Sequence, residues 1–336
     1  MAARRPLGFM GTFEQFGVAM SETGVADEAL PAVVTAQELG GSAERLIAWI
    51  ADHRREVKEL VNDRGAVLFR GFSFQSAGQF QAACKAFAPE LAHYVGGGSP
   101  RSIVSGNVYT STEYPSQEHI PLHIEASYLP DIPRYIFFMC LVAPTDRGQT
   151  PLGDMRDVLN KIDHAVRDRF TSRGVRYINN MHGGKGFGKS WQQTFMTEDR
   201  AAVEAKLGAD GYDYRWKPDG GLMTVRVGPA VAVHPSTGRA FWCNQAVNWH
   251  ASGFDPVTRQ ALRRLYGAEE RFPKHATFGD GGPIPDDDCT HIRRVLAEAE
   301  QEFRWHSGDV LFCDNHAVAH GRQPFSGARR VLVAMA

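Results

Sequence analysis

His123, Glu125 and His320 constrain this chain more than any other feature, because together they form a possible metal-ligand set. A His-x-carboxylate pair with one distant histidine is the facial triad that holds non-haem iron(II) and leaves coordination positions open. The tripeptide alone is a weak signal, since a chain with 13 histidines and 38 acidic residues contains such spacings by chance. A salt-bridging surface strand would explain it as well. A fold that uses this set must bring residue 123 beside residue 320.

Short strand signals follow one another after residue 100. Residues 135–142 form an unbroken apolar run, which is typical of a central strand covered on both faces. Alternating runs on either side of glycine-containing turns predict two hairpins, and two further apolar runs close the chain. The strands after the first run are expected at 212–216, 223–227, 230–234, 240–244, 310–313 and 330–335.

Many short strands separated by turns, with helices outside them, predict a mainly β fold with flanking helices (α+β), arranged as a double-stranded β-helix or jelly roll. Helices are expected at 42–64, around 80–87, from 255 onward and over 290–303. Such a fold places residues 123 and 320 at the same mouth of the barrel. Side chains at positions i and i+2 point to the same face of a strand, so His123 and Glu125 can bind one metal together.

Composition predicts one soluble domain. No linker divides residues 1–336, and we expect a helical and loop insertion around 181–300. The sequence shows neither a signal peptide nor the roughly 20 apolar residues of a membrane span, which favours a cytoplasmic protein. Balanced charge, with 37 basic and 38 acidic residues, predicts no nucleic acid or membrane partner. Five cysteines without a CxxC motif predict reduced core thiols. The oligomeric state stays open.

A second motif surrounds His320. It runs from Asp314-Asn315-His316-Ala317-Val318-Ala319-His320 through Arg322 to Gly327-Ala328-Arg329-Arg330-Val331-Leu332-Val333. This run resembles the closing motif of the TauD/TfdA group of iron(II)/2-oxoglutarate dioxygenases, and the resemblance covers most of the chain. It implies that His123, Glu125 and His320 are the metal ligands and catalytic centre, with Fe(2+), 2-oxoglutarate as cosubstrate and O2. It also implies that His316 is not a metal ligand, and that it either packs in the interior or contacts a residue that binds the metal.

The resemblance implies two residues for 2-oxoglutarate. A dicarboxylate that chelates iron at one end needs a buried cation for its other carboxylate, and the planar fork of arginine suits this task. In the family pattern this residue is the second arginine of Arg329-Arg330, and strand alternation then sends Arg329 outward. Thr150, in a Gly-x-Thr-Pro segment, is implied as a hydroxyl partner of the same carboxylate, and a plain turn residue is the less favoured alternative.

The surroundings of the ligands are most similar to the branch of this family that acts on amino acids in nonribosomal peptide and antibiotic pathways. The aspartyl hydroxylase of syringomycin assembly represents this branch. Glu125 favours hydroxylation over halogenation, because relatives that transfer chloride carry a small residue there. Some relatives place an arginine four residues after the cosubstrate arginine to bind the substrate's anion, whereas Ala334 stands there in this chain. Either another basic residue binds that anion, or the substrate is a thioester on a carrier protein.

Several polar residues near the ligands are candidates for the substrate pocket. Ordinary packing or hydrogen bonding explains each of them equally well. The candidates are Asn107, Gln117, Ser127, Tyr128 and Asn244.

Other functions fit parts of the pattern. The same iron and cosubstrate can also give epoxidation, desaturation or cyclisation, and the sequence does not choose among them. A zinc hydrolase can use a His/Glu/His set with an activated water, but it has no need of a dicarboxylate-binding arginine and threonine. In a non-catalytic jelly-roll binding module, the triad would be incidental.

Overall fold

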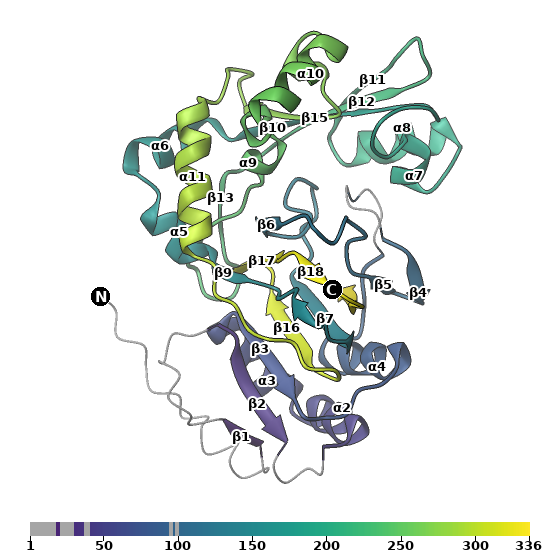
Figure 1. Ribbon diagram of the computed structural model, residues 1–336, viewed down its shortest axis with the longest axis vertical. Helices are drawn as coiled ribbons and strands as arrows, with labels where there is room; N and C mark the ends of the chain where they lie inside the picture. The colour runs from purple at the N-terminus through teal and green to yellow at the C-terminus, as the bar shows by residue number, and fades with distance from the viewer. Residues whose placement is uncertain (1–17, 21–29, 37–40, 94–96, 98–100) are drawn as a thin grey trace.

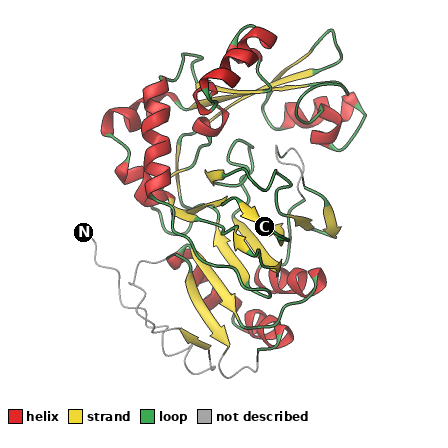
Figure 2. Cartoon of the chain, viewed as in Figure 1, coloured by secondary structure: helices red, strands yellow, loops and turns green. Residues whose placement is uncertain are grey.

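The computed structural model describes residues 18–20, 30–36, 41–93, 97 and 101–336. The chain forms a mixed α/β structure in which strands dominate the lower part of the view and helices gather in the upper part (Figure 1, Figure 2). No helix in these residues is both long and apolar enough to cross a membrane. All five cysteines are buried and unbonded to one another, as predicted.

An eight-stranded sheet is the base of the molecule. Its order is β1 (Val18–Met20), β2 (Ala32–Ala36), β3 (Ala66–Arg70), β16 (Val310–Asp314), β7 (Tyr135–Val142), β19 (Arg330–Met335), β5 (Val108–Thr110) and β4 (Ile103–Ser105). The central strand β7 is buried over most of its length, which confirms the prediction for this apolar run. One face is covered by α2 (Ala43–Asp52), α3 (Arg54–Arg64) and α4 (Ala77–Phe87).

A smaller sheet packs on the other face of the base and carries the two histidines of the triad. It consists of β6 (Ile120–His123), β17 (Val318–Arg322) and β9 (Leu152–Asp154). Leu152 and Val318 share a buried cluster with Phe138 and Leu311 of the large sheet. Two short strands, β8 (Asp146–Arg147) and β18 (Phe325–Ser326), pair beside it.

A helix-rich region follows β9 in the chain. Its four-stranded sheet has the order β11 (Asp213–Trp216), β12 (Leu222–Gly228), β10 (Val175–Met181) and β15 (Lys274–Phe278). A separate hairpin is formed by β13 (Val231–Val233) and β14 (Ala240–Trp242). The helices are α5 (Met155–Lys161), α6 (His164–Arg173), α7 (Trp191–Phe195), α8 (Arg200–Ala209), α9 (Ala246–Trp249), α10 (Pro256–Tyr266) and α11 (Asp286–Glu298). The insertion expected at 181–300 stays a prediction, and β10 begins before it.

Most predicted elements occur, but two helix boundaries were wrong. The helix expected at 42–64 is interrupted at His53, whose backbone leaves the helical region, so α2 and α3 are separate helices. The helix expected at 290–303 begins earlier, after Pro285, and ends at Glu298. Both predicted hairpins and the helix that starts after Asp255 are confirmed.

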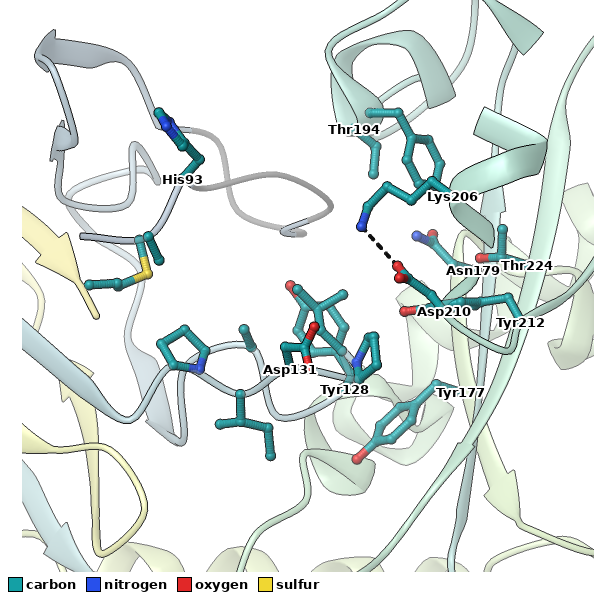
Figure 3. Close-up of a pocket in the computed structure, with 18 of the residues that line it drawn as sticks. His93, Tyr128, Asp131, Tyr177, Asn179, Thr194, Lys206, Asp210, Tyr212 and Thr224 are labelled. Carbon is teal, nitrogen blue, oxygen red and sulfur yellow. Dashed lines mark hydrogen bonds and ion pairs between the residues drawn. The ribbon is translucent and has the colours of Figure 1, made fainter. Parts of the chain in front are cut away.

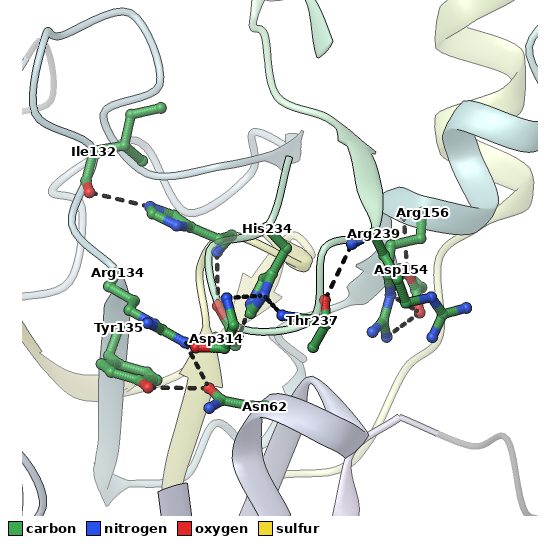
Figure 4. A network of polar contacts seen from close by, with 12 residues as sticks. Asn62, Ile132, Arg134, Tyr135, Asp154, Arg156, His234, Thr237, Arg239 and Asp314 are labelled. Carbon is green, nitrogen blue, oxygen red and sulfur yellow. Dashed lines mark hydrogen bonds and ion pairs between the residues drawn. The ribbon is translucent and has the colours of Figure 1, made fainter. Parts of the chain in front are cut away.

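A buried hydrogen bond joins the β13–β14 hairpin to the end of β16 (Figure 4). The carboxylate of Asp314 accepts hydrogen bonds from Nε2 of His234 at 2.6 Å and from the backbone N–H of His316 at 3.0 Å. Nδ1 of His234 accepts from the backbone N–H groups of Ser236 and Thr237, so the ring proton lies on Nε2. Both side chains are almost fully buried.

Replacing His234 with alanine should therefore destabilise the fold. The buried carboxylate of Asp314 loses its main partner, which costs about 3–5 kcal/mol in comparable buried pairs. Chemical denaturation measures this loss as a fall in the free energy of unfolding. Alanine at the exposed His164 is the control, and it should change that free energy by less than about 0.5 kcal/mol. Equal effects of the two variants would contradict the assignment.

Candidate metal centre

The backbone pairing of β6 and β17 brings the two histidines of the triad together. His123 and His320 are direct partners in the antiparallel register, and their ring centroids lie 4.4 Å apart. One ligand atom from each of His123, Glu125 and His320 lies within 4.8 Å of the other two. No other group of histidines, cysteines and acids among the described residues meets this criterion. The structure therefore assembles the triad that the sequence predicts.

Glu125 reaches the site from a turn, because β6 ends at His123. The expectation that the strand continues to the carboxylate was wrong. Asn315 fixes the turn instead. Its Oδ1 accepts from the backbone N–H of Glu125 at 2.9 Å, and its Nδ2 donates to the carbonyls of Glu125 and Pro133. The next residue, Ala126, has a φ of 57°, so the chain bends sharply just after the carboxylate.

A second amide holds the same turn. Nε2 of Gln245, which follows β14, donates to the carbonyl of Ile124 at 2.6 Å. The two amides thus bind the carbonyl of Ile124 and the backbone N–H and carbonyl of Glu125, the residue that carries the carboxylate ligand. Neither role could be read from the sequence, because both contacts join segments that are distant in the chain.

Replacing Asn315 with alanine should weaken metal binding and the fold together. Buried backbone groups of Glu125 and Pro133 lose their partners, at a cost of about 1–3 kcal/mol each. Residues that orient metal ligands typically contribute about 10- to 100-fold to affinity, so the Mn(II) dissociation constant should rise by that factor. Titration calorimetry measures it, with alanine at the exposed Asn248 as control. Unchanged affinity in a folded Asn315 variant would rule out the positioning role.

Burial keeps the two imidazoles neutral. It lowers the pKa of His123 and holds the pKa of His320 well below the usual range of histidine. Nδ1 of His123 lies 2.9 Å from the carbonyl of Pro121, so it donates there and leaves Nε2 free to bind a metal. Nε2 of His320 lies 3.7 Å from Oε2 of Glu125. Neutral imidazoles beside one carboxylate are the donor set that a divalent iron site requires.

Arg101 contacts the triad directly through Glu125, and this role was not predicted from the sequence. Its Nη2 donates to Oε2 of Glu125 at 2.6 Å, and both side chains are almost fully buried. No spacing signal marks this arginine, because it precedes β4 and reaches the triad only through the tertiary fold.

Arg329, and not Arg330, points into the site. Nε of Arg329 donates to the carbonyl of Gly148, and its Nη2 lies 3.3 Å from Oγ1 of Thr150. Arg330 is exposed at the start of β19. The expected alternation fails because the pairing of β19 with β7 shifts register between Arg330 and Val331.

The surroundings of Arg329 favour an anionic ligand. Burial and the neighbouring Arg322 lower its pKa to about 10, and no described carboxylate pairs with it. Thr150 is buried, and its hydroxyl also accepts from the indole N–H of Trp305 at 3.0 Å. A small cavity joins these groups to the triad. Its walls include Arg101, His123, Thr150, His320, Arg322 and Arg329. A buried cation without a counterion fits the free carboxylate of a dicarboxylate cosubstrate.

The other predicted residues divide between the site and the scaffold. Tyr128 lines a large cavity. Ser127, the preceding residue, is buried. The amide of Asn244 donates to the carbonyl of Ala230 and accepts from the N–H of Ala246, which is a scaffold role. Gln117 is exposed and Asn107 donates to the carbonyls of Leu91 and Ala92, so neither lines the two cavities described here.

His316 lies outside the triad, as the motif implies. Its ring stacks on Phe241, and its Nε2 is bonded to the carbonyl of Ile132 at 3.2 Å.

A large cavity of about 460 Å³ lies between the segment that follows Glu125 and the four-stranded sheet (Figure 3). Ala126 and Tyr128, just after Glu125, form one wall, and the four-stranded sheet forms the opposite wall through Tyr177, Asn179 and Thr224. Helix α8 contributes Lys206, which forms an ion pair with Asp210 at 2.9 Å. We call this cavity the chamber. Its size suits a small organic molecule.

A buried His/Glu/His set beside an unpaired arginine and a chamber defines a metal-dependent enzyme that binds an acidic cosubstrate. Residues 26–336 match the family described as "Taurine catabolism dioxygenase TauD, TfdA family", and the chain belongs to this family. It is a 2-oxoglutarate-dependent dioxygenase of this family, and its His/Glu/His set fits iron(II).

Two relatives cover most of the chain. The dapdiamide synthesis protein DdaC of Enterobacter agglomerans is 37% identical over 279 residues, which are 83% of this chain and 84% of DdaC. A clavaminate synthase-like protein of Arabidopsis thaliana is 32% identical over 307 residues, which are 85% of this chain and 86% of that protein.

Solved structures share the fold at low identity. PvcB of Pseudomonas aeruginosa has a TM-score of 0.52 at 18% identity, and the match covers 90% of this chain and 84% of PvcB. An asparagine oxygenase bound to Fe(II), 3-hydroxyasparagine and succinate has a TM-score of 0.53 at 11% identity, with 87% and 81% of the two chains covered.

Proposed function

We propose that His123, Glu125 and His320 hold iron(II), and that Arg329 with Thr150 holds the distal carboxylate of 2-oxoglutarate. The iron and its cosubstrate supply oxidative decarboxylation to succinate and CO2, with one oxygen atom passing to the substrate. The chain's own residues position the reactants. Asn315 and Gln245 fix the turn that carries Glu125, and Arg329 and Thr150 line a small cavity together with His123 and His320.

We also propose that the large sheet and the β6–β17–β9 sheet together form a double-stranded β-helix. Two observations support this arrangement. The sheets pack face to face through a common apolar cluster, and the triad lies where β6 and β17 pair. The shared fold with PvcB, an Fe and alpha-ketoglutarate dependent oxygenase, is consistent with it.

The reaction that we infer is hydroxylation of an unactivated carbon in an amino acid, or in an aminoacyl group bound to a carrier protein, during natural-product biosynthesis. The observation that carries this inference is the chamber of about 460 Å³, which is lined by Ala126, the residue after Glu125, and is large enough for an amino-acid-sized substrate. The names of DdaC, from dapdiamide synthesis, and of the asparagine oxygenase point in the same direction. Epoxidation, desaturation or cyclisation by the same residues is the second candidate. A cytoplasmic location remains a prediction.

Two rival functions are disfavoured. A zinc hydrolase has no use for a buried arginine and threonine aimed at a second acidic ligand, yet Arg329 and Thr150 lie beside the triad. A non-catalytic binding module is incompatible with membership of an enzyme family that spans residues 26–336.

Succinate release from 2-oxoglutarate tests the proposal. The purified protein is supplied with iron(II) and ascorbate and tested with free L-amino acids and with the same aminoacyl groups on a carrier protein. Stimulated succinate release, together with a hydroxylated product found by mass spectrometry, is the expected result. No 2-oxoglutarate turnover in a folded, iron-loaded protein would refute the proposed function, and a product other than an alcohol would favour the second candidate.

A further inference from the structure

Lys274 belongs to the sheet whose residues Asn179 and Thr224 line the chamber. It is the first residue of β15, and the antiparallel pairing places it directly opposite Asn179 of β10, which in turn lies opposite Thr224 of β12. Directly opposed residues in an antiparallel sheet project from the same face. Since Asn179 and Thr224 both line the chamber, Lys274 projects toward the same side.

The ammonium of Lys274 has an aromatic neighbour but no acidic partner. It lies 5.1 Å from the centroid of the Trp249 ring, and that ring also lines the chamber. Burial and the charge of the nearby Lys189 lower the pKa of Lys274 to about 8, and no described carboxylate offsets these effects. A cation in such surroundings is costly unless a ligand supplies the missing anion.

Other positive charges lie near Lys274. Lys274 and Arg101 both act on the pKa of His123, and Lys189 lies close enough to Arg101 to lower its own pKa. Lys206 lies elsewhere on the chamber wall, and Asp210 neutralises it. An anionic group is therefore favoured beside Lys274 rather than beside α8.

The C-terminal strand β19 does not provide a basic residue for the anion of the substrate. Counted from Arg329, the position where some relatives carry a second arginine is Val333, whose side chain packs in the cluster between the two sheets. Ala334 packs against the helices on the other side of the large sheet. Neither residue can bind an anion, so the basic residue must come from another element.

We propose that Lys274 binds the carboxylate of a free amino-acid substrate and so orients the carbon to be oxidised toward the triad. This inference rests on the proposed function and makes it more specific, because a carrier-bound thioester has no such carboxylate. Lys274 would be the substrate-specificity residue that β15 contributes. Trp249, beneath the ammonium, would restrict where the carboxylate can lie.

The test compares Lys274→Met, Lys274→Arg and the wild type in 2-oxoglutarate turnover with free L-amino acids and their primary amides. Methionine retains the packing on Trp249 without the charge, and arginine retains the charge. For the best free acid, Lys274→Met should raise KM about 10- to 100-fold and leave the KM of the matching amide within about twofold. Lys274→Arg should recover part of the loss. Methionine at the exposed Lys161 is the control and should change neither KM.

A second readout does not depend on turnover. The best acid should slow reductive dimethylation of Lys274, measured by peptide mass spectrometry, whereas its amide should not. Equal KM changes for acid and amide, or no protection by the acid, would overturn the inference. Stimulation by carrier-bound groups alone would overturn it too, but would leave the proposed function intact. Complete absence of 2-oxoglutarate turnover, with or without substrate, would contradict both.

Discussion

Replacing His320 with alanine is expected to abolish iron binding and 2-oxoglutarate turnover. The variant loses one of only three protein ligands, and the site keeps Glu125 paired with Arg101 and a single imidazole. The loss in metal affinity should exceed the roughly 10- to 100-fold effect of residues that merely orient ligands. Thermal unfolding gives a readout besides activity. A metal that binds only the folded state raises the melting temperature, so Mn(II) should stabilise the wild type but not the variant.

His316→Ala is the matched control, because it removes a second histidine from the same segment. Its ring packs on Phe241 and is not a member of the triad. This variant should lose stability through packing but should keep its stabilisation by Mn(II). If His316→Ala lost metal binding and His320→Ala kept it, the ligand assignment would be wrong.

Replacing Arg329 with alanine should weaken 2-oxoglutarate binding strongly. Truncating one partner of a buried, hydrogen-bonded charge pair costs about 2–5 kcal/mol, which corresponds to a rise in KM from about 30-fold to several thousand-fold. Maximal turnover at saturating cosubstrate should fall less, because the metal ligands remain in place. Succinate release at varied 2-oxoglutarate concentration measures both parameters.

The neighbouring arginine provides the control. Arg330→Ala removes an exposed guanidinium at the start of β19, so it should change KM for 2-oxoglutarate by no more than about twofold. The opposite ranking of the two variants would restore the assignment made from strand alternation. Lysine at position 329 should recover only part of the affinity, because an ammonium lacks the two parallel hydrogen bonds of the guanidinium.

The triad could be predicted because the motif around His320 resembles that of a known family. His123 and Glu125 are close in the chain, and a sheet that pairs β6 with β17 places His320 opposite His123. The prediction that Glu125 continues the strand failed, since the amide of Asn315 holds the carboxylate in a turn. That contact joins residues far apart in the sequence, and no local pattern reports it.

Arg329, the arginine proposed to bind 2-oxoglutarate, shows a second limit of prediction from the sequence. Alternation along β19 predicts that Arg330 points inward, but a register shift at the start of the strand reverses the order. A bulge depends on how a strand meets its neighbour, so the residues of one strand do not reveal it. The sequence analysis did not predict a role for Lys274, for a related reason. Its strand, β15, was not predicted, and only its pairing with β10 places Lys274 on the face of the sheet that lines the chamber.

The most direct test of the central claim is anaerobic addition of iron(II) and 2-oxoglutarate to the purified protein. If the triad holds iron and Arg329 holds the cosubstrate, a weak charge-transfer band should appear in the visible spectrum. The band should be missing in His320→Ala, and in Arg329→Ala it should require much more 2-oxoglutarate. A folded wild-type protein that gives no band, or variants that give the same band as the wild type, would contradict the account.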